Sequence, residues 1–140
     1  MTDSPDSADF RFPVRVYWED TDAGGVVYHA QYLAFMERAR SEWMRDMGFG
    51  QESLREANLC FVVRAMSIDF RMPAKLDDLL SVSVRLAQCR GASLVIAQDV
   101  RRGEELLVGA EVRVAAVSAD RFRPVPIPEA VLARLKPESP

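Results

Sequence analysis

Four stretches in the second half of the chain alternate apolar and polar residues, and this alternation constrains the fold most strongly. A period of two is typical of strands that bury one face. The apolar positions of these stretches are Val62, Met66, Ile68, Phe70, Leu80, Val82, Val84, Leu86, Leu94, Ile96, Leu106, Val108, Val112 and Val114. The breaks at 73–78, 90–91 and 101–104 are short enough to join antiparallel neighbours. The alternation therefore predicts a four-stranded antiparallel meander.

Two further elements precede the meander. Residues Pro13 to Glu19 alternate in the same way and predict a fifth strand. Between His29 and Met47, apolar residues recur with helical spacing and Gly48 follows, which predicts an amphipathic helix with a left-handed cap. The expected apolar stripe is Leu33, Met36, Ala39, Trp43 and Met47. Because one apolar sheet face needs such a cover, we expect an α+β fold with a five-stranded antiparallel sheet wrapped around a long central helix. A short helix is also expected at Glu129 to Leu135.

The composition predicts one globular domain and excludes several partner classes. With 140 residues, 49% of them hydrophobic, we expect a single domain at 10–136 between polar tails at 1–9 and 137–140. The formal charge of −3 offers no broad basic surface for nucleic acid. No apolar run approaches the roughly 20 residues of a membrane span. Cys60 and Cys89 lie in strand-like contexts and no leader-like segment precedes them, so we expect reduced thiols and a cytoplasmic protein.

The densest cluster of reactive groups lies between the first strand and the helix. Asp20 and Asp22 are followed by Gly24 and Gly25, and the helix starts at His29. The glycines allow close approach of the backbone or a positive φ angle. A carboxylate beside a helix N-terminus can attack a carbonyl or activate water, while free N–H groups stabilise the oxyanion. This segment is therefore the candidate active site.

Other interpretations of these residues stay open at this point. Acidic residues before a helix are common caps, so spacing alone leaves capping and catalysis equally open for Asp20 and Asp22. His29, the single histidine, can be a base, a substrate ligand or a packed side chain. With one histidine and no third clustered ligand, we expect no metal site. Cys60 and Cys89 have no neighbouring base, so a thiol nucleophile is not expected.

The spacing of these residues resembles a known family. Arg15-Val16, Thr21-Asp22, Gly25-Val26-Val27, His29 and Tyr32 resemble the signature of the 4-hydroxybenzoyl-CoA thioesterase family. The longer run from Tyr17 to Arg40 more closely resembles its YbgC-like branch, acyl-CoA thioesterases associated with the Tol-Pal envelope system. The similarity continues through 61–64, 76–78 and 90–95, so it covers nearly the whole chain.

The resemblance implies a hot-dog fold and assigns roles to single residues. The essential carboxylate falls on Asp22 rather than Asp20, and the backbone N–H that polarises the thioester carbonyl falls on His29. The implied substrate contacts are Gly25, Val26, Tyr28, Arg64, Arg90 and Ser93, the last three near the pantetheine arm or nucleotide. A solvated charge at a strand edge is an equally open interpretation of Arg64 and Arg90. Gln31 departs from the Asn or Ser of relatives and is expected to reshape the acyl pocket.

The implied activity is hydrolysis of short- to medium-chain acyl-CoA to free acid and CoA. Coenzyme A is then part of the substrate, and no cofactor is expected. The resemblance also implies a homodimer or homotetramer with active sites at the subunit interface. Two alternatives remain: hydrolysis of acyl groups on acyl carrier protein, and a scaffold or interaction protein of the envelope or lipid-synthesis machinery.

Overall fold

Five strands form one antiparallel sheet in the order β1-β3-β4-β5-β2. They are β1 (Phe10–Arg15), β2 (Cys60–Phe70), β3 (Leu79–Arg90), β4 (Ser93–Arg102) and β5 (Glu105–Val117), with helices η1 (Trp18–Asp20, a 3-10 helix), α1 (His29–Asp46), α2 (Gln51–Glu56) and α3 (Glu129–Leu135). The structure is a computed structural model that describes residues 9–135. Of the expected tails at 1–9 and 137–140, only Asp9 lies inside this range. None of the helices within it has the length and apolar character needed to cross a lipid bilayer.

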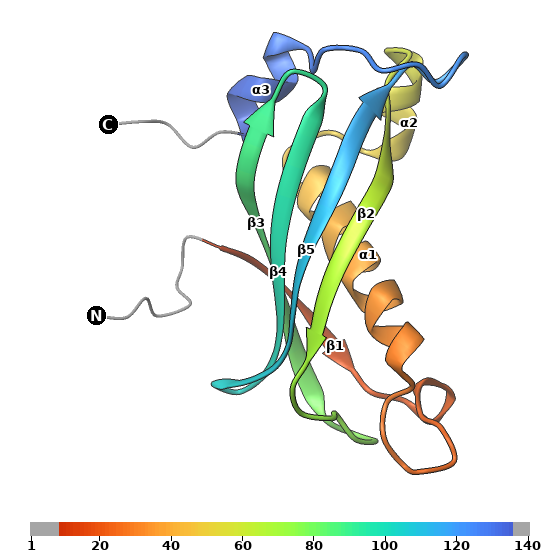
Figure 1. The fold of residues 1–140 in the computed structure, drawn as a ribbon, viewed down its shortest axis with the longest axis vertical. Helices are drawn as coiled ribbons and strands as arrows, with labels where there is room; N and C mark the ends of the chain where they lie inside the picture. The colour runs from red at the N-terminus through yellow and green to blue at the C-terminus, as the bar shows by residue number, and fades with distance from the viewer. Residues whose placement is uncertain (1–8, 136–140) are drawn as a thin grey trace.

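The core lies between α1 and one face of the sheet. The helix runs along much of the length of the strands (Figure 1). Its buried side chains are Tyr32, Phe35, Met36, Ala39 and Trp43, and the sheet contributes Val82, Val84, Ile96, Val112 and Val114 among others. Burying an apolar stripe of one helix against one sheet face stabilises both elements. The expected α+β arrangement, a five-stranded sheet around a long helix, is confirmed. The expected four-stranded meander is wrong, because only β3, β4 and β5 follow one another in the sheet, while β2 pairs with β5 and β1 pairs with β3. The segment 71–78 is therefore a crossover between β2 and β3 rather than a hairpin turn.

The boundaries of the first strand and the buried stripe of α1 differ from expectation. The strand expected at Pro13 to Glu19 is β1, which spans Phe10–Arg15. Residues Trp18–Asp20 instead form a turn of 3-10 helix, because the Asp20 carboxylate accepts the Tyr17 N–H at 2.8 Å and bends the chain. Leu33, expected in the stripe, is 38% exposed. The left-handed cap is confirmed, since Gly48 has a φ of 92°.

Irregularities in the ladders explain the other differences. The register shifts between Val63 and Ala65, so Val62 pairs with Ala115 while Met66 pairs with Val112. A bulge moves the following side chains to the opposite face, so the expectation that Val62 shares a face with Met66 is wrong. A second register shift, between Val100 and Arg101 beside the β4–β5 turn, also changes which side chains face the core. There Leu107 is fully buried, whereas Leu106 is only partly so.

Strand β2 forms one edge of the sheet. It pairs with β5 on one side, and its other side has no partner strand among residues 9–135. Apolar side chains on this strand and just after it are exposed, including Val63, Phe70 and Met72. A long apolar edge is an open template for pairing with another chain, and proteins usually cover it.

Candidate active site

A short two-stranded ladder connects Asp22 with the start of α1. The Tyr28 N–H donates to the Asp20 carbonyl at 2.9 Å, Thr21 pairs with Val27, and the Asp22 N–H donates to the Val26 carbonyl at 2.9 Å. The helix begins at the next residue, His29. Asp22 is therefore held two ladder positions away from the helix N-terminus.

The turn that closes this ladder fixes the Asp22 side chain. The Gly25 N–H donates to the Asp22 carbonyl at 3.0 Å, and Gly25 has a φ of 84°, which favours glycine. The Asp22 Oδ1 accepts the Gly24 N–H at 2.8 Å. This Asx turn orients a carboxylate that is exposed at the surface. Asp22 does not cap α1, which has no side-chain cap.

Asp20 has a different role from Asp22. Its side chain is 5% exposed, and both carboxylate oxygens accept hydrogen bonds, Oδ2 from the Tyr17 N–H and Oδ1 from the Gln31 Nε2 at 2.8 Å. Asp20 thus joins η1 to the first turn of α1. Gln31 is used for this bond and does not line the cavity beside the helix start. The expectation that Gln31 reshapes the acyl pocket stays a prediction.

The N-terminus of α1 presents backbone donors. The Gln31 N–H bonds to the Tyr28 carbonyl at 2.8 Å, but the N–H groups of His29 and Ala30 have no acceptor within residues 9–135. Unpaired first-turn amides stabilise developing negative charge. The His29 ring itself packs against aromatic neighbours, with its centroid 4.6 Å from the Tyr28 ring and 6.3 Å from the Phe70 ring. The His29 side chain makes these contacts at the exposed surface, and its backbone amide, at the helix N-terminus, is the group suited to an oxyanion.

A cavity of about 220 Å³ lies beside the helix start. It is lined by Val27, His29, Tyr32, Phe70, Arg71, Met72 and Pro73. Burial raises the pKa of Tyr32, although its hydroxyl accepts the Ala74 N–H at 2.9 Å. Apart from Arg71, His29 and the Tyr32 hydroxyl, the lining offers apolar side chains next to the unpaired amides. Such a wall suits an acyl group whose carbonyl lies at the helix N-terminus.

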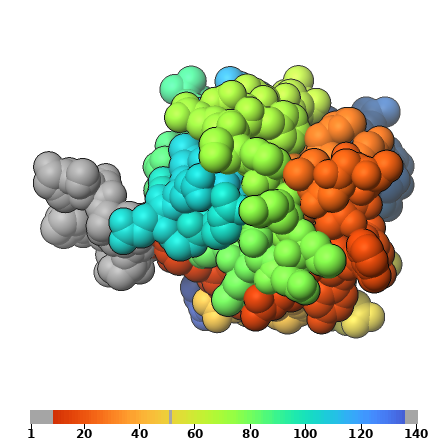
Figure 2. Space-filling model, turned by 90° about the horizontal axis from the view of Figure 1, so that it is seen from below, coloured from red at the N-terminus to blue at the C-terminus, as the bar shows by residue number. Residues whose placement is uncertain are grey.

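One chain brings together only part of the expected site. Asp22, Gly25, Val26, Tyr28 and His29 share the ladder and the helix start. The segment 20–29 that holds them lies at the end of the molecule viewed in Figure 2. In that view their orange segment lies beside the green 71–78 loop, and the cyan β4–β5 turn adjoins that loop.

The other expected contacts lie elsewhere on the chain. Arg90 and Ser93 pair across the β3–β4 turn and are both exposed. At about 3.3 Å per residue, the length of β3 separates them by roughly 35 Å from Leu79, where the strand starts near the site. Arg64 is exposed at the β2 bulge. Within one chain, these three side chains do not adjoin Asp22.

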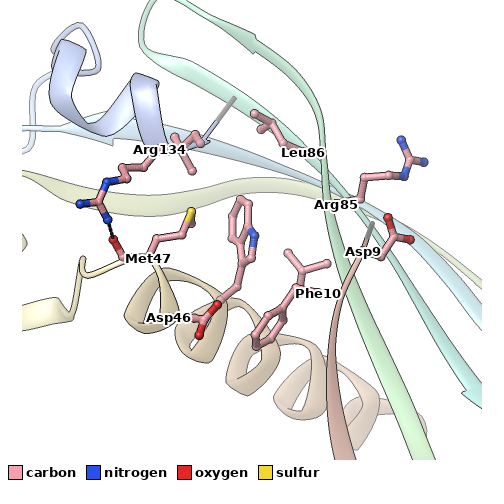
Figure 3. Close-up of a pocket in the computed structure, with 10 residues that line it drawn as sticks. Asp9, Phe10, Asp46, Met47, Arg85, Leu86 and Arg134 are labelled. Carbon is pink, nitrogen blue, oxygen red and sulfur yellow. Dashed lines mark hydrogen bonds between the residues drawn. The ribbon is translucent and has the colours of Figure 1, made fainter. Parts of the chain in front are cut away.

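A larger cavity lies elsewhere on the chain. Its volume is about 560 Å³, and it lies at the other end of α1, between Asp46, Phe10 and Arg85 (Figure 3). None of the expected site residues lines it. Arg134 at its rim donates to the Met47 carbonyl at 2.7 Å. Within residues 9–135, no group of three or more His, Cys, Asp or Glu side chains could hold a metal ion.

Comparisons with known proteins identify the family. A family model described as the thioesterase-like superfamily matches residues 16–135. The acyl-CoA thioesterase YbgC of Haemophilus influenzae is 49% identical over 125 residues, which cover 89% of this chain and 92% of that protein. The acyl-CoA thioester hydrolase YbgC of Escherichia coli is 46% identical over 128 residues, covering 91% of this chain and 96% of that protein.

Solved structures agree with this similarity. A probable thioesterase from Bartonella henselae has a TM-score of 0.81 and 43% identity, and the match covers 86% of this chain and 99% of that one. A hypothetical protein from Aquifex aeolicus has a TM-score of 0.86 and 28% identity over 91% of this chain and 99% of that one. The fold and the site thus define a hot-dog thioesterase. The chain belongs to the thioesterase-like superfamily and, within it, to the YbgC acyl-CoA thioesterases, which confirms the resemblance found in the sequence.

Proposed function

We propose that the chain hydrolyses acyl-CoA thioesters with Asp22 as the reacting carboxylate and the N-terminus of α1 as the oxyanion site. The observation that carries this assignment is the ladder that fixes Asp22 two positions from the unpaired amides of His29 and Ala30. The thioester carbonyl oxygen accepts a hydrogen bond from the His29 N–H, which stabilises the charge that develops on attack. The leaving group is the thiolate of CoA.

Asp22 can act in two ways. As a nucleophile it attacks the carbonyl carbon, expels the thiolate and forms a mixed anhydride that water then hydrolyses. As a general base it removes a proton from the attacking water. A single turnover in oxygen-18 water separates the two roles. Label in the Asp22 carboxylate identifies the nucleophile, whereas label only in the product acid, with no Asp22 hydroxamate formed in hydroxylamine, identifies the base.

The substrate we propose is a short- to medium-chain acyl-CoA. The cavity of about 220 Å³ beside the helix start is smaller than the 300–1,000 Å³ typical of ligand pockets. A thiol-release screen across acyl-CoA chain lengths tests this, and the highest kcat/KM is expected at the short end. If the purified protein released no thiol from any length, the scaffold interpretation would replace this one.

We prefer CoA to acyl carrier protein as the carrier of the acyl group. Docking of a protein carrier relies on complementary charge, usually a basic surface on the enzyme, and this chain has a formal charge of −3. Rates on matched CoA and carrier-protein thioesters of one acyl group test the choice. Equal or faster hydrolysis of the carrier-protein thioester would contradict it.

We propose that the working form contains a homodimer joined through β2, which can pair further into a tetramer. The unpaired edge of β2 and the exposed Val63 and Phe70 support this assembly. Antiparallel pairing about a two-fold axis reverses one subunit, so Arg90 and Ser93 of the partner subunit come toward the Asp22 end. Val63→Lys, at a position on the β2 edge outside the cavity beside the helix start, is expected to give monomers in sedimentation and to lower kcat/KM. A wild-type monomer with full activity would contradict the dimer.

We also place the reaction in the cytoplasm. The chain has only two cysteines among 140 residues, far from the cysteine content of a disulfide-stapled secreted domain, which suits a reducing compartment. Fractionation of cells with an antibody against the chain tests this location.

A further inference from the structure

The loop of residues 71–78, between β2 and β3, supports the ladder that carries Asp22. The Val27 N–H donates to the Ala74 carbonyl at 2.9 Å, and Val26 pairs with Lys75 in an isolated bridge. The Ala74 N–H donates to the hydroxyl of Tyr32 in α1 at 2.9 Å. The backbone around Ala74 therefore contacts both the ladder and the helix, and a displacement of this loop displaces Asp22 relative to the amides.

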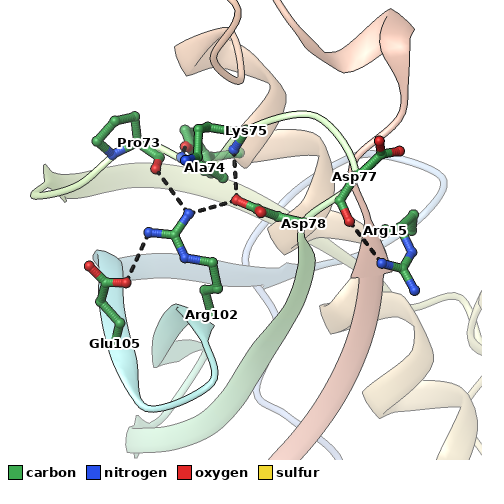
Figure 4. Close-up of polar contacts among 9 residues, drawn as sticks. Arg15, Pro73, Ala74, Lys75, Asp77, Asp78, Arg102 and Glu105 are labelled. Carbon is green, nitrogen blue, oxygen red and sulfur yellow. Dashed lines mark hydrogen bonds and ion pairs between the residues drawn. The ribbon is translucent and has the colours of Figure 1, made fainter.

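Two charged side chains fix this loop to the β4–β5 turn. The Asp78 Oδ2 accepts the Lys75 N–H at 2.8 Å and the Arg102 Nη1 at 2.6 Å (Figure 4). The Arg102 Nη2 donates to Glu105 at 2.9 Å, and Nη1 makes a longer contact of 3.5 Å with the Pro73 carbonyl. One guanidinium thus contacts both ends of the segment 73–78 and the first residue of β5.

Both members of this ion pair are less exposed than those of the Arg45–Glu42 pair on α1. The side chains of Arg102 and Asp78 are 28% and 18% exposed, whereas those of Arg45 and Glu42 on α1 are 58% and 41% exposed. Solvent screens an exposed pair strongly, so such a pair contributes little. A shielded pair with several hydrogen bonds per charge holds its geometry better.

We propose that Asp78 and Arg102 are positioning residues for the hydrolytic step, which hold Asp22 and the helix N-terminus in register through the 71–78 loop. This inference rests on the proposed role of Asp22. Neither side chain needs to touch the substrate. Their contribution is to keep the Val26–Val27 backbone against Ala74, so that the carboxylate meets a carbonyl already bound at the His29 amide.

The protonation state of Asp78 supports this role. Burial alone raises the pKa of Asp78, but the Lys75 N–H and the Arg102 guanidinium outweigh burial and hold its pKa below the usual value. The hydrogen bonds to Glu105 and Asp78 raise the pKa of Arg102. Both groups therefore stay charged at neutral pH, and the contact persists under the conditions of catalysis.

The test compares Arg102→Met, Asp78→Asn and the double variant with the wild type. Each single variant is expected to lower kcat on the order of tenfold, with KM within about twofold, because binding survives and alignment is lost. The double variant is expected to match the singles, because both remove one contact. Arg102→Lys keeps the charge and is expected to restore part of kcat. Arg45→Met, which breaks the exposed pair with Glu42, is the matched control and is expected to keep wild-type kcat.

Amide hydrogen exchange separates positioning from a general loss of stability. In Arg102→Met the Val27 N–H is expected to exchange faster, while the Val112 N–H in the core of β5 keeps its wild-type rate. Unchanged kcat and unchanged Val27 exchange in both folded single variants would overturn the proposal. So would equally faster exchange at Val27 and Val112, because that means global destabilisation. Should Arg102→Met fail to fold, Asp78→Asn carries the same test. A wild type without thioesterase activity refutes the proposed function instead, so the two failures are distinguishable.

Discussion

The Asp22 Oδ1 accepts a hydrogen bond from the Gly24 backbone N–H at 2.8 Å. This bond limits the directions that the carboxylate can take and leaves Oδ2 without a hydrogen-bond partner in the part of the chain that the structure describes. The remaining oxygen is available to a carbonyl carbon or a water. The turn therefore orients the group on which the proposed reaction depends.

Gly24→Ala tests the position of this carboxylate directly. A Cβ at residue 24 would lie 3.3 Å from the Asp22 Oδ1, so the carboxylate must move by a few tenths of an ångström. We expect kcat to fall several-fold while the melting temperature changes little, because the contact lies on the surface. Steady-state kinetics and thermal unfolding measure the two effects. Unchanged kcat would mean that the carboxylate is not positioned by this turn.

Gly25→Ala is expected to act through the backbone. No atom lies within 4 Å of a Cβ built there, but the φ of 84° strains an L-residue. The free energy of unfolding should fall by about 1 kcal/mol, and kcat should fall with it as the turn relaxes. Gly48→Ala, at a φ of 92° beyond the end of α1, is the matched control. It should lose similar stability and keep kcat; equal kcat losses in both variants would contradict a local effect.

Asp20→Ala is expected to destabilise the fold. Both Asp20 oxygens accept hydrogen bonds, and alanine leaves the Tyr17 N–H and the Gln31 amide without this acceptor. An unsatisfied buried polar group costs about 1–3 kcal/mol, which urea unfolding can measure. Gln31→Leu removes one of the two donors and should recover part of that loss in the double variant. A fully stable Asp20→Ala protein would show that Asp20 does not have the structural role inferred from its bonds.

Protonation of Asp78 is expected to lower the free energy of unfolding at acid pH. Its pKa in the folded state lies below the ordinary value of 3.8, so its stabilising contribution is complete above pH 3.8 and is lost as the pH falls through the folded-state pKa. Asp78→Asn should therefore be less stable than the wild type at neutral pH, with the difference shrinking below about pH 4. Urea unfolding between pH 2 and 7 checks this sign. A difference that grows toward low pH would contradict it.

The sequence predicts whether each long element is a helix or a strand better than it predicts the residues at which the element begins and ends. Alternation and helical spacing give the central helix and the four long strands, because burial of one face imposes those periods. They fail at bulges: the shift after Val63 reverses the facing of Met66 relative to Val62, and no local residue pattern marks it. They also miss α2 (Gln51–Glu56), which is too short to show a period.

The candidate site is also only partly predictable from the sequence. Composition and spacing identify residues 20–29, but they treat Asp20 and Asp22 alike. The family resemblance selects Asp22, and the structure adds the physical difference between the two: the Tyr17 N–H and the Gln31 amide bond to the buried Asp20, while Asp22 stays exposed on its turn. The contact between Asp78 and Arg102 could not be predicted from the sequence, because it joins residues 24 positions apart through two turns.

Asp22→Asn is the most direct test of the account. The substitution keeps the shape and the acceptor for the Gly24 N–H but removes the negative charge, so neither attack nor base catalysis remains. We expect thiol release from the best acyl-CoA to fall at least about 100-fold, with an unchanged melting temperature, while Asp120→Asn on a distant turn keeps wild-type activity. An Asp22→Asn protein that retains most of its thioesterase activity would contradict the central assignment.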